Sequence, residues 1–111
     1  MTARRYDMRP EQGSDYHLSI PVVNASGNPF TVTGWSARGQ IRHPIDSDDV
    51  LYELDDDLTV EATTVELYIP AEASSEWSWR QAVYDIELVD PDGRPTRLLE
   101  GFVFVSPEVT R

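Results

Sequence analysis

Hydrophobic and polar residues alternate most clearly near the C-terminal end of the chain, over residues 81–105. Tyr84, Ile86 and Leu88 alternate with acidic residues, so the large apolar side chains lie on one face of an extended strand. Residues 90–93 (DPDG) then break the alternation, because proline presets the backbone for a turn and glycine supplies the positive φ that closes it. The pattern predicts a β-hairpin with two long arms.

The second arm of this hairpin, residues 96–105, is apolar on both faces. A strand of this kind lies centrally in a sheet or has its second face covered. Gly101 interrupts the apolar run, which indicates a β-bulge or the close approach of another backbone segment. No catalytic group is obvious on either arm, so the hairpin favours a binding or structural role.

Shorter alternating segments precede the hairpin. Residues 15–23 alternate, and Pro21 predicts an edge strand or a strand end there because proline has no backbone N–H. A turn at residues 24–29 is indicated by its composition. Further strands are predicted from Phe30, over 35–42 and over 64–70.

Small residues mark the inward face of the predicted strand at 35–42, where Ala37, Gly39 and Ile41 point the same way. Protein interiors are close-packed, so small residues imply that a large side chain lies against them. Trp35, or an aromatic residue of the hairpin, is the expected neighbour.

The elements together predict an all-β fold with at most one short helix. That helix is expected over residues 71–77, where Pro70 and an acidic first turn fit one or two helical turns. About seven strands with turns between them are typical of an immunoglobulin-like antiparallel β-sandwich. The cysteine and tryptophan spacing of antibody domains is absent, and a small barrel is the alternative architecture.

The length of 111 residues fits a single domain, residues 1–111. Within it we interpret residues 1–11 as a docking arm, residues 44–61 as an acidic loop segment and residues 106–111 as a tail. No apolar run is long enough for a signal peptide or a membrane span, so we expect a soluble protein made in the cytoplasm. The net charge of −11 disfavours nucleic acid and anionic membranes as partners.

Candidate catalytic groups are few. The chain has no cysteine, so nucleophilic catalysis would need a serine activated by a histidine. His17 lies on the solvent side of a predicted strand, and His43 lies at a strand end. Neither a nucleophile elbow nor a phosphate-binding glycine loop is present. The sequence therefore predicts neither an enzyme nor a cofactor.

Carboxylates concentrate in residues 46–61, which contain eight acidic residues and no basic one. The apolar residues embedded among them predict a short strand between two loops. Asp46, Asp48 and Asp49 can supply oxygen ligands for calcium. Solvent and counterions are the alternative, and we predict no dedicated metal site.

Basic and aromatic residues mark candidate contact surfaces. The arginines near the N-terminus can dock onto an acidic partner, while a short edge strand or a mobile arm is the alternative. The tryptophans that follow the predicted helix share a face if that segment is extended, and they form either a platform for a sugar or a cover for one end of the sandwich. The interface candidates are Arg4, Arg5, Arg9, Asp55, Asp56, Asp57, Trp77 and Trp79.

A series of different short motifs runs along nearly the whole chain. They are residues 12–16 (QGSDY), 27–29 (GNP), 33–35 (TGW), 37–42 (ARGQIR), 84–88 (YDIEL), 92–93 (DG), 99–101 (LEG) and 106–110 (SPEVT). In this order the chain resembles small structural proteins of tailed bacteriophages, and it is similar to the N-terminal immunoglobulin-like domain of phage baseplate upper proteins. It departs from them in its acidic segment at 46–57 and in lacking their long C-terminal regions.

The resemblance implies a non-enzymatic structural component of a virion, in the tail, baseplate or neck, with other virion proteins as partners. Sheet edges, the N-terminal arm and the acidic loop would make the contacts. Arm and loop can meet head to tail between copies, which predicts a homo-oligomeric ring. A small carbohydrate-binding module and an acidic inhibitor that mimics DNA are the alternatives.

Overall fold

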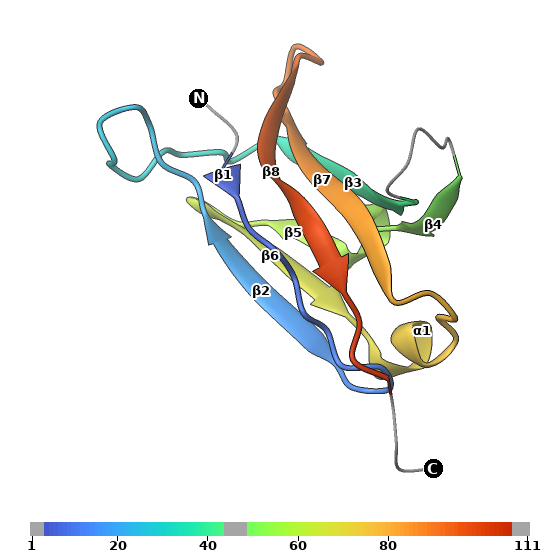
Figure 1. Cartoon of the computed structure of the whole chain (residues 1–111). Coiled ribbons are helices and arrows are strands. Elements are labelled where there is room, and N and C mark those ends of the chain that lie inside the picture. The colour runs from blue at the N-terminus through green and yellow to red at the C-terminus, as the bar shows by residue number, and fades with distance from the viewer. Residues whose placement is uncertain (1–3, 44–48, 108–111) are drawn as a thin grey trace.

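The computed structural model describes residues 4–43 and 49–107, and it contains two β-sheets packed face to face (Figure 1). The eight strands are β1 (Arg4–Arg5), β2 (Tyr16–Pro21), β3 (Ser36–Arg42), β4 (Val50–Glu53), β5 (Leu58–Val60), β6 (Thr64–Ile69), β7 (Gln81–Val89) and β8 (Pro95–Phe104). The two helical segments are the 3-10 turn η1 (Asp55–Asp57) and the short helix α1 (Ala71–Ser75).

The larger sheet has five strands in the order β1-β8-β7-β3-β4, and the smaller has three in the order β2-β6-β5. This order places β3, β7 and β8 as the central strands of one immunoglobulin sheet and β2, β6 and β5 as the other. The predicted sandwich is therefore confirmed, with eight strands, and its open edges exclude the barrel. The parallel pairing of β1 with β8 is the departure from an antiparallel fold.

The C-terminal hairpin forms as the alternation predicts, with β7 and β8 paired along their length. Asp90 Oδ1 accepts hydrogen bonds from the backbone N–H groups of Asp92 and Arg94, each at 2.9 Å, which closes the turn. The register between the two strands shifts at Leu98, which has no pairing partner in β7. Leu98 and Leu99 are therefore both buried in the core. The β-bulge is thus at Leu98, and Gly101 is instead the position where another backbone segment approaches closely.

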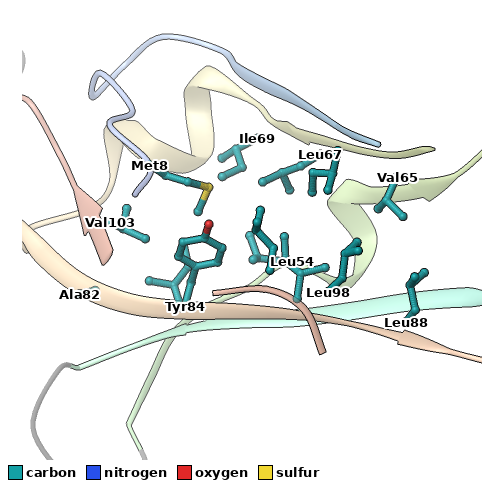
Figure 2. Packing of buried hydrophobic residues seen from close by; sticks show 14 of the residues in the cluster. Met8, Leu54, Val65, Leu67, Ile69, Ala82, Tyr84, Leu88, Leu98 and Val103 are labelled. Carbon is teal, nitrogen blue, oxygen red and sulfur yellow. The ribbon is translucent and has the colours of Figure 1, made fainter. Parts of the chain in front are cut away.

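The core lies between the two sheets and joins residues from every part of the described chain (Figure 2). Leu54 fills the space above Gly39, because a Cβ on that glycine would lie 3.2 Å from the Leu54 Cδ1 atom. At Gly39 the large neighbour is thus an aliphatic residue from the loop after β4, where an aromatic one was expected. Trp35 instead packs edge-on against Phe30, with ring centroids 5.6 Å apart.

Two local predictions are also wrong. No strand begins at Phe30, where the chain makes only an isolated bridge between Val23 and Pro29. The second predicted acidic loop contains β5, which pairs with β6. The edge position of the strand ending at Pro21 is confirmed, because β2 is the terminal strand of its sheet.

Candidate functional site

The N-terminal arm, residues 4–10, runs parallel to β8 along one edge of the larger sheet (Figure 1). Backbone hydrogen bonds join Tyr6 N–H to the Glu100 carbonyl at 2.9 Å and Met8 N–H to the Phe102 carbonyl at 2.8 Å. The Met8 side chain is completely buried in the core. The arm is thus an edge strand of its own sheet, as one of the alternatives drawn from the sequence predicts.

Gly101 is the position that lets the arm approach. A Cβ there would lie 2.2 Å from the Tyr6 carbonyl oxygen, so no side chain fits without moving the backbone. The Tyr84 hydroxyl donates to the same Tyr6 oxygen at 2.5 Å, and Asp7 Oδ1 accepts from the Phe102 N–H at 3.0 Å. Burial is the main cause that raises the pKa of Tyr84, so the hydroxyl keeps its proton for this bond.

Two of the candidate arginines cover aromatic rings on the outer face of β8. The guanidinium carbon of Arg5 lies 4.9 Å from the centre of the Phe102 ring, and that of Arg9 lies 4.8 Å from the centre of the Phe104 ring. These cation–π contacts cover the second apolar face of β8, which also lies between two strands of its sheet, so both alternatives predicted for this strand hold. Both arginines remain exposed.

Arg4 reaches across to the other sheet. Its Nη2 atom donates to the carbonyl oxygen of Pro21 at 2.5 Å, so it links the arm to the end of β2. The three arginine interface candidates therefore lie together along one side of the sandwich.

The acidic candidates lie at the opposite edge of the five-stranded sheet, next to β4. Asp55 Oδ1 accepts from the Gly39 N–H at 2.9 Å, and Asp57 Oδ2 accepts from the Tyr52 hydroxyl at 2.5 Å. Burial, followed by this bond to Asp57, raises the pKa of Tyr52. Asp55 and Asp57 thus hold η1 against β3 and β4, while Asp56 is exposed.

The calcium candidates Asp46 and Asp48 lie outside the described residues, and Asp49 is exposed. Among residues 4–43 and 49–107, no three histidine or acidic side chains lie close enough to hold a metal ion.

The tryptophan pair lies together but does not form an exposed platform. The Trp77 and Trp79 rings stack with centroids 4.7 Å apart, and Tyr52 packs edge-on against Trp77 at 5.3 Å. Trp77 is only 6% exposed and belongs to the core, while Trp79 is half-buried. Trp77 is therefore wrong as an interface candidate, and the pair covers one end of the sandwich.

Sequence reasoning missed a polar groove of about 370 Å³ on the outer face of the five-stranded sheet. Its walls include Arg38 and Glu87, which form an ion pair at 2.9 Å, and Asp85, which lies 3.6 Å from Arg97. The alternating charges of the separate strands were visible in the sequence. Only the register between the strands shows that opposite charges face each other.

One exposed cluster on β2 and β6 resembles a catalytic arrangement in composition alone. Glu66 accepts from the Ser19 hydroxyl at 2.6 Å and lies 3.1 Å from His17 Nε2. The bond from Ser19 is the main cause that lowers the pKa of Glu66. In a serine hydrolase the histidine contacts the serine, whereas here the carboxylate lies between them, so His17 cannot take the Ser19 proton directly.

No protein-family model matches this chain, and no curated protein is similar to it in sequence. No helix among the described residues is long and apolar enough to cross a membrane.

Proposed function

We propose that the protein is a non-enzymatic structural subunit that assembles with other proteins into a large particle, the virion of a tailed phage. The proposal for the particle comes from the sequence resemblance. The proposal for the mode of assembly comes from the structure, where β1 and β4 form the two opposite edges of one sheet.

The observation that carries the proposal is the opposite charge of these two edges. Residues 4–11 hold three arginines and two acidic residues, for a charge of +1, whereas residues 49–57 hold five acidic residues and no basic one, for a charge of −5. Because one edge is basic and the other acidic, contact between the basic edge of one copy and the acidic edge of the next is favoured. Contact between two like edges is disfavoured. Such contacts close into rings when the rotation between copies is right.

A direct test is sedimentation of the protein from its native source. We expect the tagged protein to sediment with a megadalton particle at fixed stoichiometry after gentle lysis and a sucrose gradient. A protein that remains a free 12.6 kDa monomer throughout the gradient would contradict the structural role.

A further inference from the structure

The free side of β2 is the longest unpaired strand edge among the described residues. Val22 N–H donates to the Thr63 carbonyl at 2.9 Å, so residues of even number in β2 direct their backbone groups towards β6. His17, Ser19 and Pro21 therefore direct theirs away from the sheet. The edge offers two N–H donors and three carbonyl acceptors, since Pro21 has no N–H.

A groove of about 190 Å³ runs between this edge and the N-terminal arm. Its walls are mainly apolar, with Leu18, Ile20 and Leu99 among them, and Arg4 and Arg5 form its basic side. An added strand at this edge would point alternate side chains into the open side of the sandwich, where the apolar walls lie. The groove thus fits one row of apolar side chains.

The contact of Arg4 with Pro21 indicates what such a strand would replace. The Arg4 guanidinium donates to the Pro21 carbonyl at 2.5 Å, which is one of the acceptors that a neighbouring strand would use. The Arg4 side chain thus donates to the Pro21 carbonyl in the position that a backbone N–H of an added strand would take. A carboxylate arriving beside Arg4 and Arg5 would pair with guanidinium groups that are already directed to this edge.

We propose that the outer edge of β2 accepts an extended segment of a partner protein as a fourth strand, and that the segment alternates apolar and acidic side chains with a carboxylate opposite Pro21. Charge complementarity selects this occupant, because both charged residues of the groove are arginines. The inference goes beyond the proposed function, since it concerns the edge strand of the smaller sheet and requires no phage particle. Arg4 and Arg5 of the arm border both edges.

The test uses the full chain and a fluorescent six-residue peptide that alternates glutamate and valine, matching the six residues of β2. Fluorescence anisotropy should show saturable binding that added salt weakens. The same peptide with lysine in place of glutamate is the charge control. Equal binding of both peptides, or no binding of the glutamate peptide at millimolar concentration, overturns the proposal.

Two matched pairs of variants locate the site. Ser19→Pro removes an outward N–H without removing a bond to β6, so it should abolish binding, whereas Ser19→Ala loses only the hydroxyl and should bind normally. Arg4→Ala should weaken binding roughly three- to tenfold, while Arg94→Ala, in the distant hairpin turn, should leave it unchanged. Unchanged binding by a folded Ser19→Pro protein overturns strand addition.

Methylation of the peptide provides a measurement that leaves the protein unaltered. N-methyl groups on the backbone nitrogens of alternate peptide residues block pairing from one side of the strand. One of the two methylated registers should lose binding and the other should retain it. Retention by both would show a purely electrostatic contact and would also overturn the proposal. Sedimentation of the native protein is independent of all these results, so the two proposals can fail separately.

Discussion

Single backbone positions decide whether the arm can lie in its place, and Gly101 is the sharpest case. We expect Gly101→Ala to destabilise the fold by about 3–4 kcal/mol, near the upper end of single substitutions, because the new methyl group would overlap the Tyr6 carbonyl. Urea unfolding measures the change. Gly27→Ala is the control, since that turn glycine has a φ of 83° but open space around it, and it should lose only about 1–2 kcal/mol. Equal losses would contradict the close approach.

Charge on the outer face of the sheet also acts residue by residue. Burial is the main cause that raises the pKa of Asp85, and it outweighs the attraction of Arg97. Because the folded-state pKa lies above the unfolded one, ionised Asp85 destabilises the fold, and this penalty disappears as the pH falls through the folded-state pKa.

Asp85→Asn should therefore be more stable than the wild type at neutral pH. Since the Asp85 side chain is 43% exposed, we expect a gain of only a few tenths of a kcal/mol. Urea unfolding at neutral and at acidic pH measures it, and the difference should vanish in acid. A less stable variant at neutral pH would show that the pairing with Arg97 dominates.

At the scale of elements, the arm behaves as a strand because one of its side chains belongs to the core. Met8→Ala should destabilise the protein by about 2–5 kcal/mol, since it leaves a cavity between the sheets. Arg94→Ala, on the exposed turn, should change stability by less than about 0.5 kcal/mol in the same unfolding experiment. A mild effect of Met8→Ala would mean that the arm leaves the core easily.

Elements with strong alternation could be predicted from the sequence, and those fixed by tertiary contacts could not. The hairpin and the strand over 64–70 follow from their period of two. The short β5 has only three residues, and its pairing with β6 decides its state. The predicted strand at Phe30 fails because Val32 donates instead to the Ala62 carbonyl, at 2.8 Å.

The candidate site also contains features that could be predicted from the sequence and features that could not. The arginines and aspartates could be chosen by charge, but the burial of Trp77 could not, because two tryptophans two residues apart look alike in a sequence. Trp77 stacks on Trp79 and packs against Tyr52, a neighbour 25 positions away in the chain. Pro21 was the one sequence signal for the edge position of β2. The groove beside it could not be predicted, because its other wall is the N-terminal arm, which is distant in the sequence.

For the whole molecule, head-to-tail assembly predicts how two variants behave when each has one of its two charged edges altered. Arg5→Glu with Arg9→Glu changes the charge of the basic edge from +1 to −3, and Glu53→Arg with Asp56→Arg reduces the charge of the acidic edge from −5 to −1. All four side chains are exposed. Either variant alone should fail to assemble, because each retains only one functional edge. Mixed together, they should form a one-to-one complex that grows no further, since the intact acidic edge of the first meets the intact basic edge of the second.

Analytical ultracentrifugation of the two variants, alone and mixed, measures these states, and unfolding curves establish that each is folded. A two-fold symmetric interface would instead place the same edge on both sides of the contact. Each variant would then either block assembly completely or leave it intact, and mixing would restore nothing. Restoration limited to a single pair therefore distinguishes a ring-forming contact from a symmetric dimer, and it does so without the native particle.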